Sequence, residues 1–158
     1  MYSPLQLHQL ALSDYERAQS KAQMQRLLSM FRHKRNDLLS LNSIVECLAS
    51  HGQRSLGLMT VCVEQIVGTV NRSDDFDRHF LPRRAVTMER WLRIKMASYR
   101  GEHLPPIELR KVGEAYFVVD GHHRVSVARE HGQQYIDAYV TELDASEDEL
   151  QKLGIAEA

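Results

Sequence analysis

The stretch LPPIELRKVGEAYFVVDGHHRVSVAREHG, residues 104–132, contains the two hydrophobic periods that decide the fold. Residues 107–112 alternate as a strand, and residues 115–119 are apolar on both faces, as in a central strand covered on each side. Gly113-Glu114 between them predicts the tight turn of a hairpin. After Asp120-Gly121 the pattern becomes helical over residues 125–131, and Gly132 is expected to end that helix.

The flanking segments extend this pattern to a sheet with helices. Residues 57–70 carry apolar side chains at alternate positions, which predicts a strand. Thr87 can cap a helix that runs to Tyr99 and stops before Gly101. Ile136, Ala138 and Val140 then form a last alternating strand. The order strand, helix, hairpin, helix, strand predicts an α+β fold with a mixed sheet.

The first 50 residues have helical spacing and predict two or three helices. Ser13 and Glu16 form a predicted capping box, a second helix is expected to start near Asn36-Asp37, and the last to end near His51-Gly52. We therefore predict three parts. They are an N-terminal helical segment at 1–54, a sheet-bearing domain at 55–143, and an acidic tail at 144–158 that is either frayed or a short helix.

Charge is unevenly distributed along the chain. The formal net charge is −1, which by itself favours neither nucleic acid nor membrane. Residues 72–100 contain eight Arg or Lys against four acids, whereas residues 141–158 contain six acids against one Lys. This contrast predicts one basic face and an acidic tail. Cys47 and Cys62 stand apart without metal-ligand spacing and are expected to be buried free thiols.

The sequence shows no secretory signal at its N-terminus. No apolar run approaches the ~18–20 residues of a membrane span. We therefore expect a cytoplasmic protein without membrane contact.

The DGHHR turn, Asp120 to Arg124, poses the functional question. Cations at the start of a helix face the positive end of its dipole and destabilise it. A bound anion reverses the sign, because the first helical N–H groups, His122, His123 and the Arg124 fork then converge on one negative group. Asp120 can cap an N–H group, and Gly121 allows positive φ and a close ligand approach. We therefore predict a phosphate site. A single His here would more often be structural, and adjacent His side chains seldom reach one ion, so we expect no metal site.

On these residues, the segment from about Val61 to Glu142 resembles the ParB/sulfiredoxin-like superfamily, most closely the ParB-like nuclease-domain proteins. Gly121-His122-His123-Arg124 fits the Gly-x-x-Arg turn of that superfamily, and the DGHHR form is similar to that of ADP-dependent free-serine kinases. The resemblance implies a ParB/sulfiredoxin-like mixed sheet over residues 55–143 and a nucleotide-phosphate pocket. His122 occupies the position of the sulfiredoxin catalytic Cys, so we do not expect sulfinic-acid reduction.

The first functional hypothesis is a nucleotide- or phosphate-binding protein. It would act as a phosphotransferase, a nucleotide phosphohydrolase or a ParB-like nuclease. The ligand would be a nucleotide (ATP, ADP and CTP are not distinguished) or a phosphorylated small molecule. Phosphate would be held by Gly121, His122, His123, Arg124 and Arg72, with Arg83 or Arg84 adding positive charge. Asp120, His122 and Asp77 are the candidate catalytic residues. The Asp74–Asp77 cluster could hold Mg²⁺ or be a solvated turn, and Asp75, Asp77 and Glu89 are candidates for the kinase-like base.

The alternative is a nucleic-acid-binding ParB-like regulator or partition accessory protein without catalysis. It rests on the basic segment 72–100, in which Phe76, Phe80, Trp91 and Tyr99 are interleaved. Trp91 and Tyr99 lie eight residues apart on one predicted helix, so facing the core is the competing interpretation. The N-terminal helices could also form a homo-oligomer interface.

Overall fold

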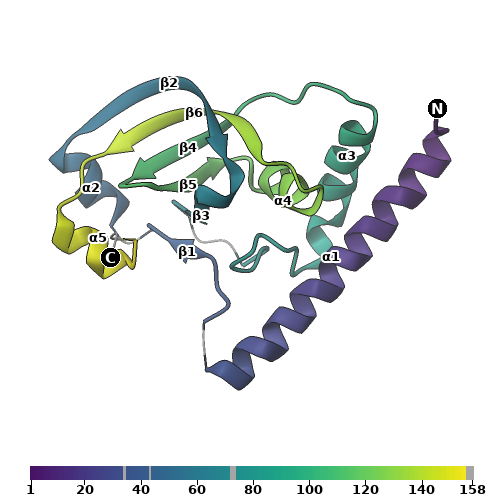
Figure 1. Ribbon diagram of the computed structural model, residues 1–158, viewed down its shortest axis with the longest axis horizontal. Helices are drawn as coiled ribbons and strands as arrows, with labels where there is room; N and C mark the ends of the chain where they lie inside the picture. Colours follow the sequence, from purple (N-terminus) through teal and green to yellow (C-terminus); the bar gives the residue numbers. More distant parts are fainter. Residues whose placement is uncertain (34, 43, 72–73, 156–158) are drawn as a thin grey trace. The chain divides into compact units, whose positions relative to one another are not determined.

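The structure is a computed structural model that describes residues 1–155 apart from 34, 43 and 72–73. In the described residues it is an α+β fold with one mixed sheet, which confirms the predicted class (Figure 1). The helices are α1 (Pro4–Arg32), α2 (Val45–His51), α3 (Met88–Tyr99), α4 (His122–Glu130) and α5 (Glu147–Leu153). The strands are β1 (Leu39–Ser40), β2 (Gln53–Cys62), β3 (Ile66–Thr69), β4 (Ile107–Val112), β5 (Ala115–Asp120) and β6 (Tyr135–Leu143).

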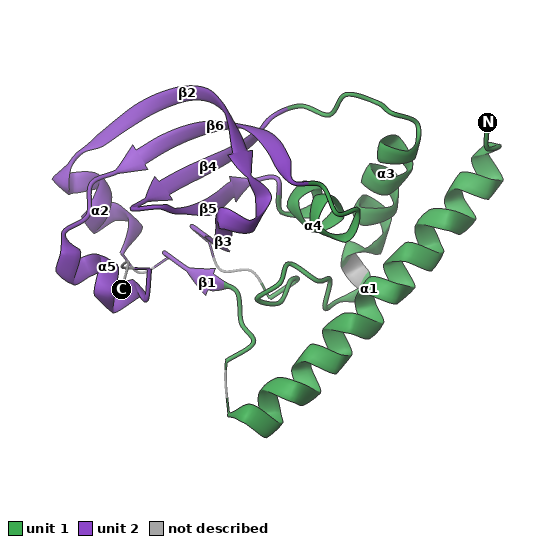
Figure 2. Ribbon diagram, viewed as in Figure 1, with its two compact units in different colours: residues 1–38, 73–105, 122–133 green, residues 39–72, 106–121, 134–158 purple. Residues whose placement is uncertain are grey.

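The chain folds into two compact units, each assembled from three separate stretches (Figure 2). Unit 1 comprises residues 1–38, 73–105 and 122–133, and unit 2 comprises residues 39–72, 106–121 and 134–158. These units do not follow the predicted boundaries at 54 and 143, because neighbouring strands of the sheet come from distant parts of the chain. Local composition cannot reveal such a division.

Unit 2 holds the sheet, whose strand order is β1-β3-β5-β4-β6-β2. The predicted hairpin is confirmed, since β4 and β5 pair antiparallel around the Gly113-Glu114 turn, and β5 is an internal strand between β3 and β4. The predicted strand in residues 57–70 is two strands, β2 and β3, separated by a 3-10 turn at Val63–Gln65. Pairing of β4 with β6 is parallel, as is that of β3 with β5.

An apolar core joins α2 and α5 to the sheet in unit 2. Leu48 of α2 and Leu150 and Leu153 of α5 pack with Phe117 and Leu143 of the sheet. Residues 147–153 are thus a packed helix, one of the two alternatives predicted for the acidic tail. Ser146 caps it and forms a capping box with Glu149.

Unit 1 is helical, and its core lies among α1, α3 and α4. Ala11, Tyr15 and Ala18 of α1 pack with Trp91 of α3 and Val127 of α4. The indole N–H of Trp91 donates to Ser126 Oγ at 2.9 Å, so the fully buried ring leaves no donor unpaired. The expectation that Trp91 faces the core is confirmed.

The predicted N-terminal helices were wrong in their boundaries. One helix, α1, runs from Pro4 to Arg32, and its capping box is formed by Ser3 and Gln6 instead of Ser13 and Glu16. Pro4 suits the first helical position because its missing N–H would have no helical partner there. The helix expected to start near Asn36-Asp37 is not found in the described residues there, since Leu39 and Ser40 pair with β3 as β1. The predicted end at His51-Gly52 is confirmed.

The structure also bears on the predicted Thr87 cap, the two cysteines and the absence of a membrane span. Thr87 precedes α3 but makes no side-chain cap, because its hydroxyl donates to the Arg84 carbonyl at 2.8 Å. Cys47 and Cys62 are free thiols, yet neither is buried: Cys47 is exposed and Cys62 half-buried. Of the helices in the described part of the chain, none is both long and apolar enough for a membrane crossing.

Candidate phosphate-binding site

The predicted site lies where β5 gives way to α4. Asp120 is the exposed last residue of β5 in unit 2, and Gly121 follows with φ 116°, a conformation that favours glycine, as predicted. His122, His123 and Arg124 form the first turn of α4 in unit 1. That turn contains no acidic residue. The first N–H groups of a helix have no partner within it, so this turn has the donor chemistry of an anion site.

The two imidazole rings lie against Phe76 within unit 1. The His122 ring is nearly parallel to the phenyl ring at a centroid distance of 6.4 Å, and the His123 ring meets it edge-on at 5.1 Å. His123 Nε2 is buried and has no hydrogen-bond partner in the part of the chain that the structure describes. Most buried polar atoms in proteins are hydrogen-bonded, so an orphan atom at this position calls for an explanation.

The charge state of His123 differs from the sequence expectation of three potential cations. Burial lowers the pKa of His123, and the charges of Arg90 and His122 lower it further, against an opposing effect of Asp75. The ring is therefore neutral near pH 7. A neutral imidazole carries one N–H donor and one acceptor, so His123 can contribute a hydrogen bond without destabilising the start of α4.

Arg124 is half-buried and is positioned by the loop before β4. Its Nη1 donates to the Pro105 carbonyl at 2.6 Å, and both residues belong to unit 1. This bond uses one of the five guanidinium N–H donors. The contact holds the guanidinium at the first turn of α4, which reduces the entropy lost when an arginine binds an anion.

Asp77, a predicted catalytic residue, is fully buried. Its Oδ1 accepts from the backbone N–H of His79 at 2.8 Å and of Leu81 at 3.0 Å, and Oδ2 has no partner among the described residues. Burial raises the pKa of Asp77, although those two hydrogen bonds oppose the shift. Asp77 therefore organises the turn in which Phe80 adopts φ 59°. Its catalytic role stays a prediction.

The other predicted groups are not gathered around one ligand. Asp74 pairs with Arg84 at 3.8 Å, and Arg83 pairs with Asp37 at 3.0 Å. Arg72 lies outside the described residues. Within the described ranges, no three His, Cys, Asp or Glu side chains are grouped so that they could hold a metal ion.

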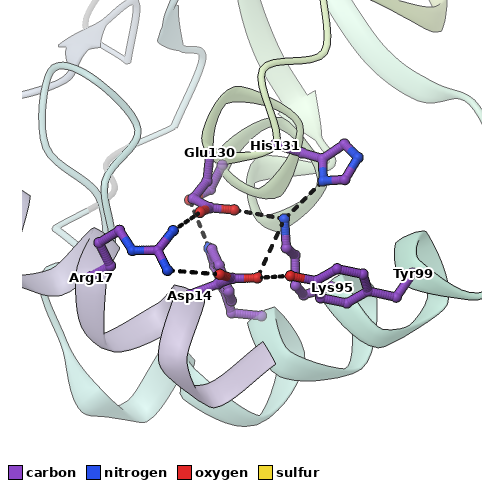
Figure 3. Close-up of polar contacts among 8 residues, drawn as sticks. Asp14, Arg17, Lys95, Tyr99, Glu130 and His131 are labelled. Atoms are coloured by element: carbon purple, nitrogen blue, oxygen red, sulfur yellow. Dashed lines mark hydrogen bonds and ion pairs between the residues drawn. The ribbon is translucent and has the colours of Figure 1, made fainter. Parts of the chain in front are cut away.

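A buried ionic network that the sequence analysis missed lies elsewhere in unit 1 (Figure 3). Lys95 of α3 is only 2% exposed, and its Nζ donates to Glu130 Oε2 at 2.6 Å and to His131 Nδ1 at 3.0 Å. Asp14 of α1 is 3.8 Å from the same ammonium, and Arg17 lies 3.5 Å from Asp14 and 3.9 Å from Glu130. Two cations thus balance two carboxylates.

Tyr99 completes this network by donating its hydroxyl hydrogen to Asp14. Burial raises the pKa of Tyr99 to about 12, with help from the hydrogen bond and charge of Asp14. The network connects α1, α3 and the end of α4, so it fixes the helix whose first turn carries His122 to Arg124. One signal was available in the sequence: Lys95 lies four residues from both Trp91 and Tyr99 and therefore shares their buried helix face.

The aromatic residues of the basic segment are in the wrong place to stack on bases. Phe76, Phe80 and Trp91 are at most 1% exposed, and Tyr99 is occupied by the ionic network. These rings are therefore not available to stack on bases, and the nucleic-acid-binding alternative stays a prediction.

Comparison of the sequence with models of known protein families and with curated proteins found no match in either case. The resemblance to the ParB/sulfiredoxin-like superfamily therefore rests on the segment 104–132 and its DGHHR turn, and it stays a prediction.

Proposed function

We propose that this protein binds the phosphate group of a nucleotide or another phosphorylated small molecule at the first turn of α4. The backbone N–H groups of that turn, the His123 ring and the Arg124 guanidinium would be the donors. Asp120 and Gly121 precede this turn directly in the chain. The proposal follows from the residue types of the DGHHR turn and from the resemblance to the ParB/sulfiredoxin-like superfamily that this turn carries.

The observation that carries the proposal is the orphan Nε2 of His123. This atom is buried, belongs to a neutral ring, and has no partner among the described residues. Leaving a buried polar group unpaired costs about 1–3 kcal/mol. A phosphate oxygen bonded to Nε2–H would remove that cost, and the positive end of the α4 dipole would favour the same charge.

A phosphate bound at this turn is compatible with phosphoryl transfer and with hydrolysis, and both reactions need the same kinds of protein group. Transfer or hydrolysis needs a group that orients the nucleophile and donors that stabilise the charge of the transition state. Asp120 directly precedes the turn that would bind the phosphate, and His122 belongs to it. Mg²⁺ could bind to the site through the phosphates of the ligand. We therefore extend the proposal to a phosphotransferase or nucleotide phosphohydrolase, with binding as the step to test first.

The test is thermal unfolding with ATP, ADP, CTP and GTP, each with and without Mg²⁺. A ligand at about 100 times its Kd stabilises the folded state by about 2.7 kcal/mol. For a chain of this length that raises Tm by roughly 5–10 °C. Absence of a shift with all four nucleotides contradicts the proposal.

Three variants locate the effect. Arg124→Ala should abolish the shift, and Arg124→Lys should reduce it because the planar fork is lost while the charge stays. Arg93→Ala is the matched control, since Arg93 is exposed on α3, outside the proposed site. If nucleotide raises the Tm of Arg124→Ala by as much as that of Arg93→Ala, the nucleotide binds outside the proposed site.

A further inference from the structure

Unit 1 contains two polar cavities along the C-terminal half of α1, on residues separate from the α4 turn. The first has a volume of about 580 Å³, and its polar lining includes Gln19, Gln23, Arg26, Asn36, Arg83 and Arg84. The second has a volume of about 310 Å³ and is lined by Gln25, Arg32, Arg35, Asn36, Arg78 and His79, among others. Ser29 and Asn36 belong to both, so the cavities adjoin. We call the pair the basic groove.

The charges in the two cavities differ. In the first cavity the two acids are already neutralised, because Asp37 pairs with Arg83 and Asp74 with Arg84. The second cavity has no acid among its described lining residues, and no described carboxylate pairs with its three arginines, Arg32, Arg35 and Arg78. Three guanidinium groups that no described carboxylate pairs with, arranged around one small cavity, raise the local concentration of anions.

Asn36 gives the groove a further donor. Its backbone carbonyl accepts from Arg83 Nη2 at 2.5 Å and from the Arg78 N–H at 3.0 Å, which fixes the residue between the cavities. Its side-chain Nδ2 is buried and has no partner within the described residues. Since an amide nitrogen can only donate, the missing partner is an acceptor. Together with the arginines, this predicts an oxygen-rich anion.

The helix dipole does not account for this arrangement. Arg32 lies in the last turn of α1, where a cation is favourable. Arg35 and Arg78 lie outside the helices. The dipole of α1 therefore does not explain why these two arginines line the same cavity as Arg32.

The shape of the groove favours a chain over a compact molecule. Its lining runs along α1 from Gln19 to Ser29 and Arg32, which at 1.5 Å per residue is about 20 Å. Phe31, which is 83% exposed, comes three residues after Leu28 of the second cavity, so the two side chains are neighbours on the surface of α1. A basic groove beside an exposed aromatic ring is the combination that binds single-stranded nucleic acid.

We propose that the basic groove of unit 1 binds the backbone of single-stranded nucleic acid, with phosphates on Arg32, Arg35 and Arg78 and a base stacked on Phe31. This is a second anion site and does not depend on the proposed site at α4. Arginine suits phosphate because its fork binds two oxygens at once.

The test uses the full chain and fluorescently labelled oligo-dT and oligo-U of about 20 nucleotides, titrated between about 50 and 200 mM salt. The double variant Arg32→Ala/Arg78→Ala is compared with Arg93→Ala/Arg100→Ala, which removes two exposed arginines of unit 1 away from the groove. For single strands each lost phosphate contact reduces the slope of log K against log salt by about 0.7. The groove variant should therefore lose about 1.4 from the slope and bind roughly tenfold more weakly, whereas the control should retain both values.

Phe31→Leu and Phe31→Ala test the stacking contact. Loss of the ring should weaken binding several-fold in both variants without changing the salt slope, because stacking involves no charge. Circular dichroism checks that all variants are folded, and the nucleotide-induced Tm shift should persist in them.

Four results would overturn the proposal. The first two are no binding of either oligonucleotide, and an equal loss of affinity in the groove and control double variants. The other two are unchanged affinity in both Phe31 variants, and binding of a mononucleotide or of poly-glutamate as tight as that of the oligonucleotides. The last would mean a small phosphorylated ligand or a general polyanion surface. The nucleotide-induced Tm shift of Arg124→Ala tests the α4 site only. Its result neither supports nor contradicts the proposal for the groove.

Discussion

The two units of this chain have opposite charge. Unit 1 contains fifteen Lys and Arg against nine Asp and Glu, a formal charge of +6, whereas unit 2 contains five against twelve, a formal charge of −7. The net charge of −1 conceals this contrast. Bulk charge therefore could not exclude an anion-binding role, because the relevant charge is that of the unit carrying the candidate sites. Both proposed anion sites use side chains of unit 1.

The units also differ in what holds them together. Unit 2 is a sheet whose helices α2 and α5 pack on it through apolar side chains. In unit 1 an apolar core is supplemented by the ionic network of Lys95, Asp14 and Glu130. A buried network of charges is sensitive to the loss of one member, whereas an apolar core is sensitive to changes of volume. The variants below test this difference.

The largest effect is expected from Lys95→Met in unit 1. The substitution keeps an apolar stem of similar length but leaves Asp14 and Glu130 as buried carboxylates without their ammonium partner. Removing one member of a buried ion pair costs about 3–5 kcal/mol, which urea unfolding at pH 7 can measure. Lys152→Met on the exposed face of α5 is the control and should stay within about 0.5 kcal/mol of the unmodified chain.

Glu130→Gln in the Lys95→Met background should recover part of the loss, since it leaves one carboxylate instead of two for Arg17 to balance. Equal unfolding midpoints for the Lys95 and Lys152 variants would show that the network does not stabilise unit 1.

A smaller effect is expected from Gly68→Ala in unit 2. A Cβ at this position would lie 2.2 Å from the Leu39 carbonyl oxygen of β1 and 2.8 Å from the Phe117 ring of β5. Because the first neighbour is backbone, β1 would have to move, at a cost of about 2 kcal/mol. Hydrogen exchange should accelerate at the Leu41 amide, which donates to Thr69 at 2.8 Å. The exposed change Glu64→Ala is the control, and unchanged exchange at Leu41 in Gly68→Ala would contradict the close packing.

The smallest effect concerns the pH dependence contributed by Asp77. Its raised pKa means that the folded chain holds this proton more tightly than the unfolded chain does. The stability contribution is therefore complete below the unfolded pKa of 3.8 and is lost as the pH rises through the folded pKa. Asp77→Asn keeps an acceptor for His79 and Leu81 and removes the titration. The free energy of unfolding of the variant, relative to the unmodified chain, should rise between about pH 4 and 7, and a constant difference would contradict the burial effect.

The sequence predicted the hairpin and the β5–α4 junction well because their signals are local. Gly113 supplies the turn, and Gly121 and Gly132 mark the start and end of α4. The pairing of Leu39-Ser40 with β3 could not be predicted, since a two-residue strand has no period and depends on a partner almost 30 residues away. Ser13 and Glu16 matched a capping box but lie inside a longer helix, because Ser3-Pro4 and Gln6 form the actual cap.

For the candidate sites the limit was similar. The residue types of the DGHHR turn predicted anion chemistry, but the sequence could not show that burial keeps His123 neutral. Phe76 and Trp91 looked suited to stacking on bases, yet both serve the core, while Phe31 is exposed. The basic groove combines Arg32 with Arg78, which are distant in sequence, so no local pattern could reveal it.

The pKa of the His123 ring, measured by NMR titration with and without the nucleotide that stabilises the chain most, tests the phosphate site most directly. In the unliganded chain it should lie below 6.5, because burial and neighbouring cations disfavour the charged ring. A phosphate at the first turn of α4 should raise this pKa, since an adjacent anion favours the imidazolium. An unchanged His123 pKa at saturating nucleotide would contradict the proposed site.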